Sequence, residues 1–200
     1  NLNKNNDALA SYQQLMQQYP QSPEADEALE NIKAIYVEEG RPNEYVELMR
    51  RNGKNISVSE ADSLTYTAAE LKYNNNDCNG AIKGFNNYLS QYADGAFALE
   101  ASFYRSECYY KNKEWQSALE GYDYVHARGL NKFYEKATLI AARIHYFELK
   151  DYSNAKKYFT SLAAGAVSQE NQLEALRGLV RCYHQLKDYT QANESAKQLL

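Results

Sequence analysis

Apolar side chains recur three and four residues apart through most of the chain, a spacing that predicts amphipathic helices rather than strands. In the run KEWQSALEGYDYV, residues 113–125, this spacing places Trp115, Ala118 and Tyr122 on one side of a helix. The same order of a large ring, a small residue and a second ring returns 37 residues later in DYSNAKKYF. The pattern therefore predicts a helical repeat protein.

The small residue in the middle of this pattern marks an anchor position for each repeat. The intervals between anchors are 37, 36, 37, 37 and 37 residues, and the anchors are Ala8, Tyr45, Ala81, Ala118, Ala155 and Ala192. A second column lies nine residues before the anchors and holds tyrosine in four of five cases: Tyr36, Lys72, Tyr109, Tyr146 and Tyr183. Two columns in one register predict a pair of helices in every repeat.

These columns resemble the tetratricopeptide repeat (TPR), a helix-turn-helix unit of about 34 residues that stacks into a superhelix. Pro20, after the second helix of the first repeat, fits the same family. The resemblance covers all 200 residues and implies an all-α solenoid of about eleven antiparallel helices with a 37-residue period. It implies one array, with a partial repeat at 1–20 and further repeats at 22–57, 58–95, 96–130, 131–167 and 168–200.

The second repeat departs most from the pattern. Its partner helix, expected from Asn43 to about Arg51, has Tyr45 where a small residue would let two helices approach closely. The polar linker that follows is the place where a bend is expected. In the next repeat, Gly80 and Gly84 each weaken their helix by about 1 kcal/mol relative to alanine, so tertiary packing must support it. A continuous helix is expected over residues 132–150.

The charge of the chain limits its classes of partner. The net charge is −4 and the isoelectric point is near 5.5, which argues against duplex nucleic acid as a partner. Charge is uneven, because residues 1–50 hold nine acidic and four basic residues, whereas residues 101–200 hold eleven acidic and fourteen basic ones. No apolar run approaches the 18 residues of a membrane span, so membrane insertion is not expected. Because the chain opens and closes inside helices, we expect a piece of a longer protein.

No motif of a catalytic site is present, and neither catalytic residues nor a cofactor are predicted. Cys108, His145 and Cys182 lie at the same offset, ten residues before their anchors. Stacked helices lie about 10 Å apart, whereas zinc ligands lie about 2.0–2.3 Å from one ion. We therefore interpret this column as buried packing and predict no metal site. His126, near a helix end, is expected to be exposed.

The TPR resemblance implies a concave face, built from the first helix of each pair, along which a partner peptide often lies. Taking this face at constant offsets from the anchors gives the expected binding residues Tyr66, Glu70, Tyr73, Phe103, Glu107, Tyr110, Ile144, Phe147, Arg177, Arg181 and His184. Exposed apolar area at its centre is expected from Tyr66, Tyr73, Phe103, Tyr110, Ile140 and Phe147.

Two alternatives remain open for these residues. The apolar side chains could instead fill the wall between adjacent helices. Arg177 and Arg181, one helical turn apart, could clamp a carboxylate or a phosphate. They could equally be ordinary surface charges paired with Glu174.

The expected function is a non-catalytic scaffold that binds another protein or peptide segment. The segment YPQSPEA resembles bacterial cell-envelope TPR proteins of the TolA-binding and outer-membrane assembly type, which implies a periplasmic or outer-membrane-associated location, with the cytoplasm as the alternative. One alternative is a self-association module that stacks through its uncapped terminal repeats into a homo-oligomer. Another is a regulatory array within a larger envelope protein.

Overall fold

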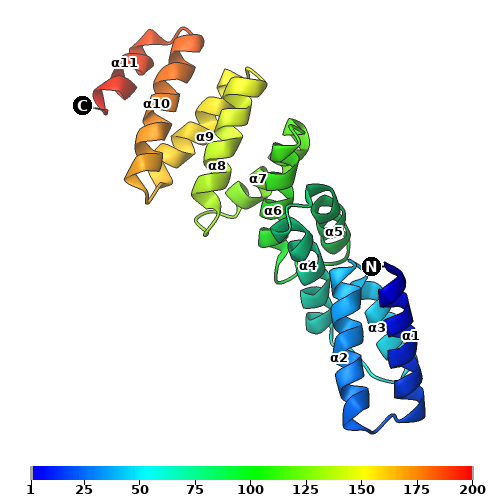
Figure 1. Cartoon of the computed structure of the whole chain (residues 1–200). Coiled ribbons are helices and arrows are strands. Elements are labelled where there is room, and N and C mark those ends of the chain that lie inside the picture. Colours follow the sequence, from blue (N-terminus) through cyan, green and yellow to red (C-terminus); the bar gives the residue numbers. More distant parts are fainter. Residues whose placement is uncertain (1, 200) are drawn as a thin grey trace. The chain divides into compact units, whose positions relative to one another are not determined.

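We describe residues 2–199 in a computed structural model, with side chains from residue 4 onward. The described residues form eleven α-helices and no strand, which confirms the all-helical prediction (Figure 1). The helices are α1 (Leu2–Gln18), α2 (Pro23–Glu38), α3 (Pro42–Arg51), α4 (Val58–Asn74), α5 (Cys78–Gln91), α6 (Ala98–Lys111), α7 (Trp115–Ala127), α8 (Tyr134–Arg143), α9 (Tyr152–Gly165), α10 (Gln169–Gln185) and α11 (Tyr189–Lys197). A short π-helix, η1 (Ile144–Glu148), directly follows α8.

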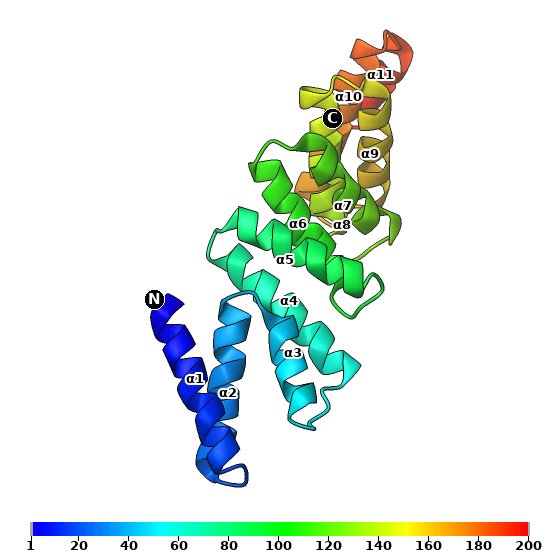
Figure 2. The ribbon, with the colours of Figure 1, turned by 90° about the vertical axis from the view of Figure 1, so that its right-hand side faces the viewer.

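Contacts divide the chain into two compact units. Unit 1 ends at Ala101 and unit 2 begins at Ser102, so the boundary lies inside α6. In unit 1, α1 and α2 lie side by side in both views (Figures 1 and 2). In unit 2, α9 packs against both α8 and α10. The grouping of all these helices into one array with the boundaries given above stays a prediction.

One kind of turn joins the two helices of each predicted repeat. It contains a residue in the left-handed region of φ, where glycine is favoured: Gly40, Asn76, Lys113, Lys150 and Lys187. In four turns the next N–H donates to the carbonyl five residues earlier: Arg41 to Tyr36, Asp77 to Lys72, Glu114 to Tyr109 and Asp188 to Tyr183. Three helices then start under an aspartate cap, which accepts a hydrogen bond from a backbone N–H of the first turn: Asp77, Asp151 and Asp188.

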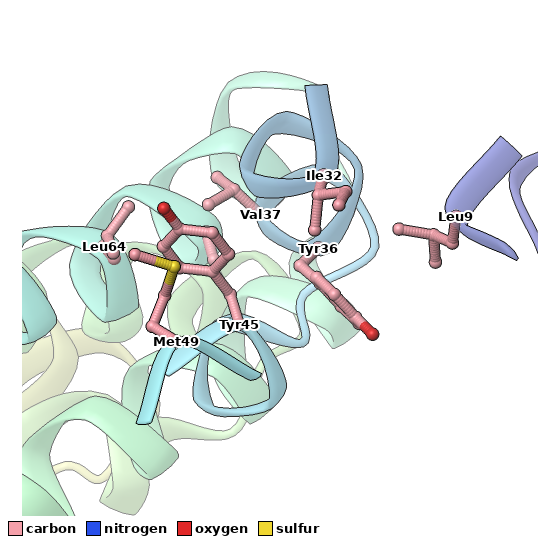
Figure 3. Close-up of a cluster of buried hydrophobic side chains, with 8 residues drawn as sticks. Leu9, Ile32, Tyr36, Val37, Tyr45, Met49 and Leu64 are labelled. Carbon is pink, nitrogen blue, oxygen red and sulfur yellow. The ribbon is translucent and has the colours of Figure 1, made fainter. Parts of the chain in front are cut away.

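The core of unit 1 includes the helix that departs from the repeat pattern. Tyr45 of α3 is buried in a cluster that also holds Ile32, Met49 and Leu64 (Figure 3). Burial away from water raises the pKa of Tyr45 to about 12. The large ring thus fills the space that a closer helix approach would remove in a regular repeat.

Small residues bring helices close together elsewhere. A Cβ added at Gly84 would lie 2.7 Å from the Cβ of Ala69, so α5 runs directly against α4. In unit 2, a Cβ at Gly121 would collide with the Ser106 hydroxyl and the Ser102 carbonyl. Tight packing of this kind supports the glycine-containing helices, as the sequence required.

The helix expected over residues 132–150 is present from Tyr134 to Glu148, but it is not a regular α-helix throughout, because the α-helix ends at Arg143 and a π turn follows. The N–H of Leu149 donates to the Ile144 carbonyl at 3.0 Å, a five-residue step. The N–H of Asp151 then reaches back six residues to the His145 carbonyl, whereas the other turns span five. Repeat five therefore accommodates one extra residue at the end of its first helix.

This extra residue shifts the register of α8. Ile144, not His145, is fully buried at the place where Cys108 and Cys182 are buried in the neighbouring repeats. The packing column is therefore Cys108, Ile144 and Cys182, and the expected place of His145 in it is wrong. Alignment of the turns matches Tyr110 to Tyr146 and Lys113 to Lys150, so the extra residue lies within the stretch Phe147, Glu148 and Leu149. Within residues 2–199, none of the helices has both the length and the apolar character of a bilayer-spanning segment.

Candidate functional site

Ion pairs join three first helices of unit 2 on one surface. Lys136 of α8 pairs with Glu107 of α6, and Arg143 of α8 pairs with Glu174 of α10 at 3.1 Å. Arg181, further along α10, lies 4.0 Å from the same Glu174 carboxylate. We call the surface marked by these five residues the ladder face.

The cations of the ladder face are exposed and the carboxylates are recessed. The side chains of Lys136, Arg143 and Arg181 are 58%, 44% and 48% exposed. Those of Glu107 and Glu174 are only 12% and 22% exposed. An approaching molecule therefore meets positive charge first.

Glu107 is held from two sides. Its Oε1 accepts a hydrogen bond from the Tyr122 hydroxyl at 2.7 Å, and its Oε2 accepts one from the Lys136 ammonium group. The Lys136 Nζ also lies 5.2 Å from the centre of the Phe103 ring, within the range of a cation–π contact. These contacts fix Lys136 over α6.

Aromatic side chains lie where the first helices end. Tyr110 is 37% exposed and meets the Trp115 ring edge-on, with ring centres 5.4 Å apart. His184 is exposed and contacts Tyr189 in the same edge-on manner at 5.6 Å. Phe147, in the π turn, is 46% exposed, and its ring meets the Tyr146 ring edge-on. Of the predicted binding residues, Tyr110, Phe147 and His184 are thus open to a partner.

The expectation of exposed apolar area is wrong for Tyr66 and Phe103, because both rings are buried. Tyr66 stacks on Phe97 with ring centres 4.4 Å apart, and Phe103 stacks on Phe133 at 4.3 Å. Both rings fill the wall between helices, the alternative that the sequence had left open.

Ile144 is also buried, and Ile140 is half-buried. Both were assigned to the concave face by a constant offset from Ala155, and the π turn invalidates that offset. The residue of α8 that matches Glu107 is Arg143, and sequence reasoning missed it together with Lys136. The shift could have been recognised from the spacing of three alanines that are buried at equivalent positions. Ala137 follows Ala101 by 36 residues and precedes Ala175 by 38, whereas the anchors here are 37 residues apart.

The remaining predicted residues divide between the two units. In unit 1, Glu70 accepts a hydrogen bond from the Tyr66 hydroxyl at 2.6 Å, and Tyr73 is half-buried. In unit 2, Arg177 and Arg181 are exposed on α10, one turn apart. The pairing with Glu174 holds for Arg181, whereas Arg177 has no ion-pair partner among residues 2–199.

His126 is half-buried, so its expected exposure is wrong. Its Nδ1 lies 2.9 Å from the Thr138 hydroxyl, and its ring lies between Tyr134 and Tyr158. Burial lowers the pKa of His126, and the nearby Asp123 carboxylate partly opposes this shift. The hydroxyl of Tyr158 donates to that carboxylate at 2.5 Å, so these groups form a packed polar cluster.

The cysteines lie apart from any cluster of metal ligands. Cys108 and Cys182 are buried, and burial raises the pKa of the Cys182 thiol to about 11. Among the described residues, no group of three or more histidine, cysteine, aspartate or glutamate side chains is placed to hold a metal ion.

A cavity of about 480 Å³ opens in unit 1 where the α2–α3 turn faces α4 and α5. Small residues form much of its wall, among them Ala68, Ala69 and Gly84. Arg41, one of the three cationic side chains that line it, already donates hydrogen bonds to the carboxylates of Glu39 and Glu44. The cavity is open to solvent and lies beside α3.

Comparison with known proteins agrees with this architecture. A family model described as tetratricopeptide repeat matches residues 1–22. No curated protein matches the sequence.

Several solved structures have a similar fold. BtubC (BKLC) from P. vanneervenii is 11% identical with a TM-score of 0.55, over 98% of this chain and 87% of that one. TPR-like repeats from Podosopora anserina are 16% identical with a TM-score of 0.52, over 90% and 95%. Pseudomonas aeruginosa pilF is 14% identical with a TM-score of 0.51, over 98% and 92%. At such identities the likeness shows the fold alone. The matches support a TPR-type solenoid, a fold that generally mediates protein–protein interaction.

Proposed function

We propose that this chain is a non-catalytic scaffold that binds an extended segment of another protein along the ladder face of unit 2. The observation that carries the proposal is the π turn, which places the exposed ring of Phe147 one turn beyond Arg143 on the same first helix. A bulge of this kind in a helix is frequently found at functional sites. Exposed aromatic rings beside arginines are the residue types that dominate protein interfaces.

The predicted binding residues enter this proposal unequally. Tyr110, Phe147, Arg177, Arg181 and His184 are exposed and would touch the partner directly. Glu107 would act through Lys136, which it holds in place. Buried Phe103 and Ile144 would support the surface from below.

The test compares two double variants, each of which replaces two exposed large side chains with alanine. In Tyr110→Ala with Phe147→Ala, exposed rings are lost from the first helices. In the control, Leu130→Ala with Val167→Ala, strongly exposed apolar side chains are lost from inter-helix loops. Each protein would be used to capture partners from a bacterial envelope extract, and the retained segment would be synthesised for titration calorimetry.

We expect the wild type and the control to bind the synthesised segment, and the ring variant to bind at least about tenfold more weakly. Circular dichroism would show whether the ring variant keeps its helices. Equal binding by all three folded proteins would overturn the proposal.

We further propose a location in the bacterial cell envelope. Its support is the resemblance of the segment YPQSPEA to envelope proteins of the TolA-binding and outer-membrane assembly type. Fractionation of cells that express the gene from its own promoter would test this location.

A further inference from the structure

We infer that the segment bound by the ladder face is acidic and carries an apolar side chain among its carboxylates. The inference rests on the proposed function and adds the chemical class of the partner. Its basis is the set of arginines that α8 and α10 place at or near the recessed carboxylate of Glu174.

Two guanidinium groups lie against the Glu174 carboxylate, and a third is carried by the same helix, α10. Arg143 and Arg181 both reach Glu174, and Arg177 precedes Arg181 by one helical turn. Arg143, Arg177 and Arg181 give three positive charges against the one negative charge of Glu174, while the other carboxylates of α8 and α10, Glu135 and Glu170, lie in the first turns of these helices. The surface around Glu174 is therefore cationic. The chain as a whole has a net charge of −4, so overall composition does not account for this local excess.

The recessed glutamates hold the cationic side chains in place but leave most of their N–H donors free to bind a partner. A guanidinium has five N–H donors, and the hydrogen bond to Glu174 at 3.1 Å occupies one donor of Arg143. Because the side chain is already oriented, less conformational entropy is lost when a second carboxylate binds. Arg143 can therefore add a charge-assisted hydrogen bond to an incoming acidic group.

Phe147 defines the apolar part of the ligand. Its exposed ring lies four residues after Arg143, and the next residue, Glu148, is an exposed carboxylate. An apolar side chain of the partner would cover the ring, while the partner's carboxylates would be drawn toward the arginines and kept from Glu148. This arrangement predicts a mixed acidic and apolar sequence rather than a purely acidic tract.

The test uses three short synthetic peptides of equal length, built from repeated Glu-Glu-Phe, Lys-Lys-Phe or Glu-Glu-Gly. Fluorescence anisotropy with labelled peptides would measure their affinity for the full chain. We expect Glu-Glu-Phe to bind most tightly and to weaken as salt rises from about 0.1 M to about 1 M, because salt screens exposed charges.

Matched variants identify the surface. Arg143→Gln, Arg177→Gln and Arg181→Gln together should weaken Glu-Glu-Phe binding at least about tenfold. The control triple variant, Arg128→Gln, Lys157→Gln and Lys197→Gln, removes the same charge from the region of the partner helices α7, α9 and α11 and should bind like the wild type.

Different results would contradict this inference and the proposed function. If Lys-Lys-Phe binds as tightly as Glu-Glu-Phe, the acidic class is wrong while the ring-dependent binding of the proposed function stands. If no peptide binds, the inference is also wrong, and the capture experiment judges the proposed function separately. If an oligonucleotide or the isolated segment of residues 1–50 competes better than Glu-Glu-Phe, the ligand is nucleic acid or a second copy of this chain.

Discussion

His126 lies half-buried in unit 2, with its imidazole between the rings of Tyr134 and Tyr158. Its centre lies 5.3 Å from the stacked Tyr134 ring and 5.1 Å from the edge-on Tyr158 ring. The protonated form would lose hydration in this position, which is why burial lowers the pKa of His126. Asp123 favours the protonated form but does not outweigh burial.

This residue predicts a pH dependence of stability. The unfolded chain has a histidine pKa of about 6.5, so below that pH it binds more protons at His126 than the folded chain does. The free energy of unfolding must then fall as pH falls. We expect the urea midpoint of the wild type to decrease from pH 7.5 to pH 5.5, as measured by circular dichroism.

His126→Gln is the matched variant, because glutamine does not titrate and can still reach the Thr138 hydroxyl. Its midpoint should decrease less over the same pH interval. The other charged side chains contribute equally to both proteins, so an identical pH dependence would contradict the role of His126.

At the scale of elements, η1 decides which residues of the fifth repeat are buried. A five-residue backbone step replaces the usual four-residue step between Ile144 and Leu149. Ile144 thereby reaches the core, while Lys150 keeps its positive φ and Asp151 still caps the next helix, as in other repeats. The ring of Phe147, in the π turn, is left on the surface.

Deleting Phe147 should convert the π turn into an ordinary α-helical end. With one residue removed, the segment that begins at Ile144 would align without a gap with the segment of the α6–α7 turn that begins at Cys108. We expect unchanged helicity and an unfolding free energy within about 1 kcal/mol of the wild type, since regular geometry replaces a rare one. Urea unfolding of the deletion variant would measure this.

Ile144→Ala provides the contrast, because it removes a fully buried side chain and should cost about 2–5 kcal/mol. A deletion variant that loses as much stability as Ile144→Ala would show that the extra residue is needed for packing. The partner-binding surface would also lose its ring on deletion of Phe147, so binding should weaken while stability is retained.

At the scale of the whole molecule, the division into two units predicts separable unfolding. Trp115 is the single tryptophan and lies in unit 2, so its fluorescence reports on that unit. Tyr45 lies in the core of unit 1. Tyr45→Ala should destabilise unit 1 by about 3–5 kcal/mol, as expected for the loss of a large buried ring.

We expect this variant to lose helicity in two steps during urea titration, with the first step at lower urea than in the wild type. The Trp115 fluorescence midpoint should stay unchanged, because stability in repeat arrays comes from each repeat and its nearest neighbours. Parallel shifts of circular dichroism and fluorescence would show instead that the units unfold as one.

Much of the fold followed from the sequence, since helical periodicity and the spacing of the anchors depend only on which residues are apolar, aromatic or small. Ala81, Ala118 and Ala155 are fully buried, as positions of close helix approach must be. The capping aspartates and the turns before them also follow from local chemistry, because their hydrogen bonds join neighbours in the chain.

The candidate site followed only in part. Tyr110 and the arginines of α10 are exposed as expected, because their helices keep the register that the anchors define. Phe147 is exposed as expected because it lies in the π turn, after the shifted part of α8. Lys136 and Arg143 were missed, and Ile144 was misplaced, because one inserted residue rotates everything before it on α8. A constant offset cannot reveal such a rotation.

The sequence by itself determined the repeat, the helix pairs and their turns, because each depends on interactions within about one repeat. Only the tertiary structure decided which aromatic rings are buried between helices and which are exposed on the surface. Tyr66 and Phe103 are apolar at face positions, yet they are buried because Phe97 and Phe133 from the following connections stack on them. The ladder face likewise arises where Glu107, Lys136, Arg143 and Glu174 from three helices meet, and packing between repeats brings them together.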